Sequence, residues 1–216
     1  MRVTVADGML AADFGGERRV LSSAVLGGGI GSARAWLNAT VPGDYARTDP
    51  EADLAARAAA LALPRPVVGM LTAADVRAHR HARRGVARAI ATVGVGHGLA
   101  AAGTRPRALP AVGTINLLVV VDAALDDGAL AGAAQTAVEA KAQALAAARV
   151  PASNAAGFAT GTATDAFCIA ALPGASVRFA GPATRLGADI AWAVFAAVHA
   201  GALADRAAPA AREEAG

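Results

Sequence analysis

The only lysine of this chain, Lys141, stands where a helix should face its core. Residues 126–149 have helical periodicity, and Asp126-Asp127-Gly128 is a typical helix start. The apolar residues that share a narrow arc with Lys141, at about 100° per residue, are Leu130, Ala134, Val138 and Leu145. A buried ammonium group needs an anion or a route to water, because an unpaired buried charge is costly. We therefore expect a carboxylate opposite Lys141.

Asp165 is the candidate for that carboxylate. It lies in a threonine-rich segment, 159–167, that we predict to begin a strand over 160–171. In an extended chain Thr160, Thr162 and Thr164 share one face, and Asp165 points to the other, toward a covering helix. We predict that Lys141 and Asp165 pair, either as a structural ion pair or as the charged centre of a site.

Further polar candidates lie at strand ends. Thr114 and Asn116 share a face at the start of an apolar strand predicted over 112–121, where they can bind a carbonyl or amide or make a structural turn bond. His97 stands among glycines after a strand predicted over 85–95. Glu139 precedes Lys141 by two residues and points to the opposite side of the helix, so the two can contact one substrate atom only if the helix is distorted.

Several familiar kinds of chemistry are excluded by motif. The chain has no glycine-lysine phosphate loop, no complete G-x-G-x-x-G, no G-x-S-x-G and no H-E-x-x-H. Its one cysteine, Cys168, excludes an internal disulfide and a multi-cysteine zinc site, and we interpret it as a core residue. His79 and His81 could meet a metal from one strand face, but no third ligand has a characteristic spacing, so we predict no metal site.

Charge and hydropathy narrow the partners and the location. An arginine cluster over 77–88 could bind phosphate, but it lacks interleaved aromatics and fits a solvated edge, so we expect no nucleic acid. No apolar run is long enough to span a membrane and no cleavable leader is evident, so we expect a cytoplasmic protein that does not contact membranes. Residues 207–216 are predicted to be a disordered tail after a single domain over 1–206.

The predicted elements indicate an α+β fold. Short alternating runs at 2–6, 10–14 and 18–26 are separated by Asp7-Gly8 and Gly15-Gly16, both hairpin signals, and 32–50 is predicted to be a long loop. Helices are expected over 49–63, 126–149 and 181–203, and strands over 67–72 and the stretches named above. Hairpins mixed with crossovers favour a mixed, largely antiparallel sheet covered by three main helices, which can layer as an α/β sandwich.

Seven segments in this order resemble the adenosylcobinamide amidohydrolase family of corrinoid salvage, across about residues 20–205. They are Leu21-Ser22-Ser23-Ala24, Val68-Gly69-Met70-Leu71-Thr72-Ala73-Ala74, Ala91-Thr92-Val93-Gly94, Gly113-Thr114-Ile115-Asn116, Glu139-Ala140-Lys141, Ala159-Thr160-Gly161-Thr162-Ala163-Thr164-Asp165, and Ala180-Gly181-Pro182 with Thr184, Leu186 and Gly187. The chain departs from the family at 95–98, where a serine-asparagine pair is expected.

The resemblance implies hydrolysis of the amide that joins the aminopropanol arm to the corrin ring of adenosylcobinamide, which releases adenosylcobyric acid. It implies a small-molecule corrinoid partner and allows a homo-oligomer. We expect no cofactor, because the cobalt belongs to the substrate. A corrinoid-binding or chaperone protein without catalysis is the alternative.

Amide hydrolysis needs an activated nucleophile, a stabilised oxyanion and a proton for the leaving amine. Asp165 or Glu139 could activate water while Lys141 or Asn116 stabilises the oxyanion. Thr160 or Thr162 could instead attack directly, with the lysine as base. The corrin ring would need a broad apolar cleft, which the 32–50 segment could line with Trp36 and Tyr45.

Overall fold

The structure, a computed structural model, describes residues 1–102 and 113–208. Its strands are β1 (Arg2–Ala6), β2 (Met9–Ser22), β3 (Gly29–Thr40), β4 (Val67–Thr72), β5 (Arg80–Arg84), β6 (Ala87–Gly94), β7 (Thr114–Leu125) and β8 (Ala166–Val177). Its helices are α1 (Pro50–Ala60), α2 (Asp127–Ala147) and α3 (Arg185–Ala207), with one 3-10 turn at Val76–Ala78.

The strands form one mixed sheet in the order β4-β3-β2-β8-β7-β6-β5, with β1 paired to β2. Within residues 1–102 and 113–208, the β3–β4 and β7–β8 pairs are parallel and the other strand pairs are antiparallel. The predicted α+β class, with a largely antiparallel sheet and three main helices, is confirmed.

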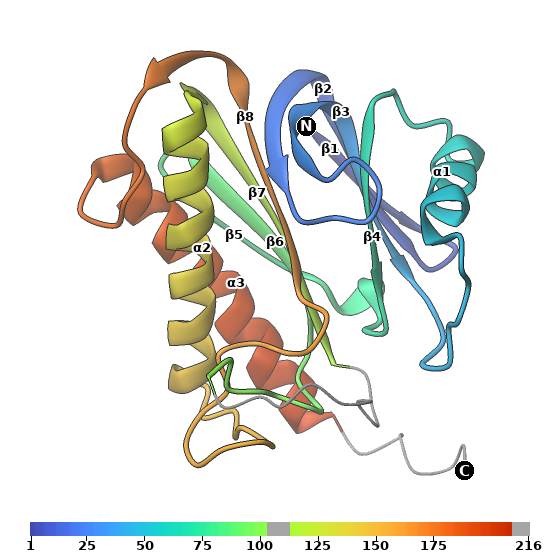
Figure 1. The fold of residues 1–216 in the computed structure, drawn as a ribbon, viewed down its shortest axis with the longest axis vertical. Helices are drawn as coiled ribbons and strands as arrows, with labels where there is room; N and C mark the ends of the chain where they lie inside the picture. The colour runs from blue at the N-terminus through green and yellow to red at the C-terminus, as the bar shows by residue number, and fades with distance from the viewer. Residues whose placement is uncertain (103–112, 209–216) are drawn as a thin grey trace.

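The sheet bends at β2 into two halves that pack on each other. One apolar cluster fills the space between the halves and includes Trp36, Met70 and Leu118. A second cluster packs α1 against the β2–β4 half, and a third packs α2 and α3 against the β5–β8 half. Figure 1 shows α1 on one side of the molecule and α2 with α3 on the other, so the fold is layered helix, sheet, sheet, helix.

The bend in β2 corrects one hairpin prediction. Asp7 and Gly8 do form a tight turn, with φ of 49° and 71°, and β1 pairs back on β2. Gly15-Gly16 does not turn the chain. The register to β3 shifts between Asp13 and Arg18, and Gly15 has φ of 74°, so these glycines form a bulge that redirects one continuous strand.

The predicted loop over 32–50 is also wrong, because its first part is the buried strand β3. Residues 35–39 are all buried, since a helix covers one face of the strand and the other sheet half covers the opposite face. A strand buried on both faces shows no alternation of polar and apolar residues, so the periodicity on which the prediction relied was absent.

The strand predicted over 160–171 begins only at Ala166, and 160–165 is an irregular segment with isolated bridges. The remaining predicted strands and the three helices are present, with ends shifted by a few residues. The predicted strand over 112–121 starts at Thr114, and its first residue, like most of the predicted tail, lies outside the described residues.

Helix α3 is long and apolar enough to span a membrane by length and composition alone. Half of its apolar stretch is buried inside the fold, where Ile190, Val194 and Val198 pack on the β5–β8 half. The hydropathy of α3 is therefore accounted for by its place in the core.

Candidate active site

The ion pair predicted between Lys141 and Asp165 is present. Lys141 projects from the third quarter of α2 and is only 8% exposed, and its Nζ contacts Oδ2 of Asp165. Asp165 comes from the segment that leads into β8, so the two charges meet from elements 24 residues apart. Val138, predicted to share the buried arc of Lys141, is 42% exposed, and the buried stripe is therefore narrower than expected.

Asp165 holds four donors. Its Oδ2 accepts from Lys141 and from the amide of Thr162, the latter at 3.1 Å. Its Oδ1 accepts from the amide of Ile115 at 2.9 Å and contacts the hydroxyl of Thr162. A carboxylate has about four lone-pair sites, so this one is saturated by the protein when the Thr162 hydroxyl points to it. The carboxylate is held on both sides and its position is fixed.

The hydroxyl of Thr162 lies between two acceptors. Besides Asp165 Oδ1, it is 2.6 Å from the carbonyl oxygen of Gly113. A hydroxyl has one proton, so it can donate to only one of them at a time. Thr162 is half-buried, and it is the one side-chain hydroxyl that contacts Asp165 among residues 1–102 and 113–208.

Two glycines make this close packing possible. A Cβ on Gly161 would lie 2.5 Å from Oδ2 of Asp165 and 2.8 Å from Nζ of Lys141. A Cβ on Gly113 would lie 2.9 Å from the carbonyl oxygen of Gly94. Neither glycine was singled out by the sequence analysis, although each sits in a segment that resembles the family. For Gly161, its place between two threonines was the available signal.

The other threonines anchor the segment. Thr160 is exposed, and its hydroxyl accepts from the amide of Ala101 at 3.0 Å. The hydroxyls of Thr114 and Thr164 are 2.8 Å apart, and Thr164 also donates to the Gly113 carbonyl at 3.1 Å. The threonines were expected to share one strand face, but the segment is irregular: Thr162 and Thr164 both reach the Gly113 carbonyl, and Thr160 binds the amide of Ala101.

His97 is brought to the same end of the sheet. It lies in the exposed turn after β6, and its amide nitrogen would be 3.4 Å from a Cβ on Gly113. Its backbone therefore lies beside the Thr162 segment, while its side chain is exposed. The predicted substrate-binding role of His97 stays a prediction.

Asn116 belongs to a buried network rather than to the exposed site. Its Nδ2 donates to Oδ1 of Asn38 and to the carbonyl of Leu71, both at 2.8 Å, and Asn38 in turn donates to Thr92. Asn116 is 0% exposed, and both of its amide protons are used. It joins the two halves of the sheet and has no proton left for an oxyanion.

Three predicted site residues lie elsewhere. Glu139 is exposed on α2 and accepts from Gln135 at 2.9 Å, because the helical geometry turns it away from Lys141. Trp36 is 0% exposed in the core between the sheet halves, so it cannot line an open cleft. Tyr45 donates to Asp53 of α1 at 3.0 Å and therefore sits in the layer remote from α2.

The buried thiol of Cys168 is unreactive. Burial raises its pKa to about 12, and a hydrogen bond with Ser22 opposes that rise only in part. A thiol needs to ionise to act as a nucleophile, so Cys168 is a core residue as predicted. Among residues 1–102 and 113–208, no three side chains of His, Cys, Asp or Glu gather as metal ligands.

Fold and site together define an α+β protein with a saturated lysine–aspartate–threonine cluster at the end of its central strands. The sequence profile of the adenosylcobinamide amidohydrolase family matches residues 1–210, and the chain belongs to that family. It is 35% identical over 206 residues to an adenosylcobinamide amidohydrolase of Halobacterium salinarum, covering 91% of this chain and 85% of that protein. The resemblance drawn from the seven segments is confirmed.

Proposed function

We propose that this protein hydrolyses the aminopropanol amide of adenosylcobinamide, which yields adenosylcobyric acid and free aminopropanol in corrinoid salvage. Family membership supports the reaction. One observation carries the assignment of the site. The half-buried hydroxyl of Thr162 contacts the carboxylate of Asp165, which in turn binds the almost buried ammonium group of Lys141.

The geometry favours Thr162 as the nucleophile over a water molecule. Water activated by Asp165 would need a free lone pair on the carboxylate, and the four sites are taken by protein donors. Thr162 Oγ already contacts Asp165. The proton that Asp165 can accept is therefore the hydroxyl proton of Thr162, and losing that proton makes Oγ a nucleophile. Lys141 then acts through its charge rather than as the base.

The proposed reaction has two halves. Thr162 Oγ bonds to the amide carbon while its proton passes to Asp165, and the oxyanion faces Nζ of Lys141. Collapse breaks the C–N bond, and the proton returns from Asp165 to the leaving amine. A water then attacks the threonine ester, gives its proton to Asp165 and releases the carboxylic acid. The threonine recovers its proton, so the net reaction consumes one water.

Lys141 is suited to hold the oxyanion. An ammonium group carries three N–H bonds, and Asp165 takes one of them. Gly161 lets the backbone pass so close that a side chain there would fill the space beside Nζ. A positive group held in place before the reaction stabilises developing negative charge without reorganisation.

We further propose that the enzyme works in the cytoplasm, acts on its corrinoid without a resident cofactor, and engages neither nucleic acid nor membranes. Support comes from the single, buried, un-ionised cysteine, which suits a reducing compartment, and from the burial of α3 in the core. The arginines are partly used within the fold, as where Arg88 faces Asp122 at 3.8 Å.

The test is to mix the purified protein with adenosylcobinamide and measure free aminopropanol and adenosylcobyric acid by mass spectrometry. Stoichiometric formation of both over many turnovers is expected. Tight binding of the corrinoid without release of aminopropanol would instead identify a corrinoid-binding protein and contradict the proposal.

A further inference from the structure

A second feature of the molecule lies away from the Lys141–Asp165 pair. A cleft of about 630 Å³ opens between β1 and the β5–β6 hairpin, and we call it the β1–β5 cleft. It is lined by Met1, Val3, Val5, His79, His81, Ala82, Arg83, Arg88, Ala89 and Ile90. A cavity of this size with mainly apolar walls and a few polar groups is typical of a small-molecule site.

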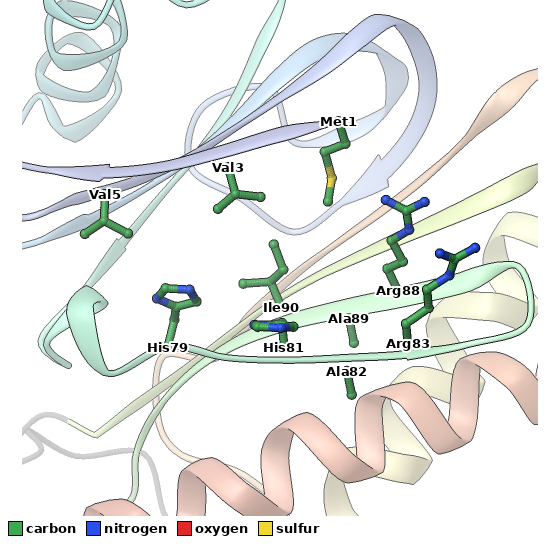
Figure 2. A pocket seen from close by; sticks show the side chains of 10 residues that line it. All are labelled: Met1, Val3, Val5, His79, His81, Ala82, Arg83, Arg88, Ala89 and Ile90. Atoms are coloured by element: carbon green, nitrogen blue, oxygen red, sulfur yellow. The ribbon is translucent and has the colours of Figure 1, made fainter.

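The two walls of the cleft differ in chemistry. Figure 2 shows Met1, Val3 and Val5 projecting from β1 toward β5 and β6, and the histidines projecting back toward β1. The valines are 38% and 40% exposed, so this apolar strand face is left uncovered by the protein. One wall therefore offers an apolar plane, and the other offers imidazoles and guanidinium groups.

His79 is prepared to bind a metal through one nitrogen. Its Nδ1 is 3.0 Å from the carbonyl oxygen of Val76, and a carbonyl can only accept, so Nδ1 carries the proton. In a neutral ring the lone pair then belongs to Nε2, on the side of the ring away from that carbonyl. A histidine whose other nitrogen donates to a backbone carbonyl is the usual form of a metal ligand.

In the part of the chain that the structure describes, one nitrogen of a guanidinium at the far end of the cleft lacks a hydrogen-bond partner, although the same group faces Asp122 at 3.8 Å. The Nε of Arg88 is buried and has no hydrogen-bond partner among the described residues, and its neighbour across the strands is Arg83. The accessible parts of the two guanidinium groups line the cleft, and such donors fit the amide oxygens that surround a corrin ring. The arginines predicted to be only a solvated edge therefore help to line a cleft.

The cleft and the Lys141–Asp165 pair lie toward the same end of the β5–β8 half but on opposite faces, because the cleft faces β1 and Lys141 comes from α2. His79 immediately precedes β5, at the end where β6 pairs Gly94 with Thr114 of β7, and Asp165 binds the amide of Ile115 there. From β5 to β8 there are three strand spacings, about 14 Å. The amide-bearing arm of a ring bound at β5 would therefore have to pass round that end of the sheet to reach Asp165 and Lys141.

We propose that the β1–β5 cleft holds the corrin ring of the substrate, with Nε2 of His79 as an axial ligand of the cobalt. The step is a ligand exchange in which a Co–N bond forms, a Co–O bond to water breaks, and no electron is transferred. The adenosyl group keeps the opposite axial position. This inference rests on the proposed function for the identity of the ligand, whereas the cleft and the tautomer are features of the structure.

Electron paramagnetic resonance on cobinamide reduced to Co(II) tests the ligation directly. Wild-type protein is expected to split the axial cobalt lines into triplets, because one ¹⁴N binds the metal, and protein labelled with ¹⁵N-histidine should give doublets. His79→Ala should remove the splitting and weaken cobinamide binding at least tenfold. His81→Ala, the matched control on the same strand face, should keep the splitting. If His79→Ala folds poorly, doublets in the labelled wild-type sample together with splitting retained in His81→Ala, His97→Ala and His199→Ala assign the ligand to His79.

Unsplit lines in saturated wild-type protein, or triplets that persist in His79→Ala, would overturn the inference. Aminopropanol release from adenosylcobinamide is measured on the same wild-type preparation. Release with unsplit lines refutes the histidine ligation and leaves the proposed function standing. Split lines without release refute the hydrolase and leave the β1–β5 cleft as a corrinoid site.

Discussion

The Lys141 ammonium and the Asp165 carboxylate meet at one end of the sheet, the first from helix α2 and the second from the irregular segment before β8. Each is nearly buried, and their side chains are 10% and 15% exposed. Removing either charge leaves the other without its partner in a place of low dielectric, so structure and proposed chemistry depend on the same pair.

Replacing Lys141 with methionine should abolish turnover and lower the free energy of unfolding by about 3–5 kcal/mol, because Asp165 keeps its charge without its partner. Asp165→Asn should have a similar effect. Urea unfolding and aminopropanol release measure the two consequences separately. Full activity in a folded Lys141→Met protein would rule out a catalytic role for the ammonium group.

The double variant Lys141→Met with Asp165→Leu is the control for stability. It removes both charges, so it should regain much of the stability lost by either single variant while staying inactive. A double variant that is stable and active would show that the ion pair is only structural.

Gly161→Ala should inactivate the protein by displacing the pair. Its Cβ would lie 2.5 Å from Asp165 Oδ2, a distance that real contacts do not show, so a charged group must move. Gly43→Ala, where a Cβ has open space, is the matched control and should keep wild-type activity. Equal activity of the two variants would show that the close approach is not needed.

Asn38→Leu should destabilise the protein by about 1–3 kcal/mol, because it removes the acceptor of Asn116 Nδ2 and the donor to Thr92 in a fully buried place. Chemical denaturation checks the loss. An unchanged unfolding midpoint would mean that the network does not hold the two sheet halves together.

Cys168 should resist thiol reagents at pH 8 in the native protein and react at once in urea, because burial raises its pKa to about 12. The unfolded thiol ionises near its ordinary value of 9.0, so the contribution of this group to stability is complete below that pH. It is lost progressively as the pH rises toward 12. Rapid native labelling would contradict the burial.

Much of this arrangement could be predicted from the sequence because its signals are local. The helical arc placed Lys141 among buried residues, and its charge then required an acid, which led to Asp165. The layers and the bend could not be predicted, since Gly15-Gly16 has the same local signature in a hairpin and in a bulge. Only the pairing of β2 with both β3 and β8 distinguishes them.

Trp36 shows why the sequence points to the wrong residues for a corrin-binding cleft. An aromatic residue in a stretch without periodicity is typical of a binding loop, but a strand buried on both faces has the same pattern. Conversely, the sequence predicts no metal at His79 because no third ligand accompanies the histidines, and it predicts only a solvated edge at Arg88 because no aromatics interleave with the arginines. A cleft assembled from β1, β5 and β6 depends on contacts between segments about 80 residues apart, which spacing along the chain does not reveal.

The central claim is that Thr162 attacks the amide while Asp165 takes its proton. Thr162→Ala should lower the turnover number at least a thousandfold and leave corrinoid binding intact, whereas Thr162→Ser should retain measurable turnover. Thr164→Ala is the matched control, because Thr164 binds the same Gly113 carbonyl but does not contact Asp165.

The most direct measurement is intact-protein mass spectrometry after rapid acid quench of the enzyme with adenosylcobinamide. The account predicts a covalent corrinoid ester on a peptide containing Thr162, which is absent in Thr162→Ala and present in Thr164→Ala. Undiminished aminopropanol release by folded Thr162→Ala would contradict it.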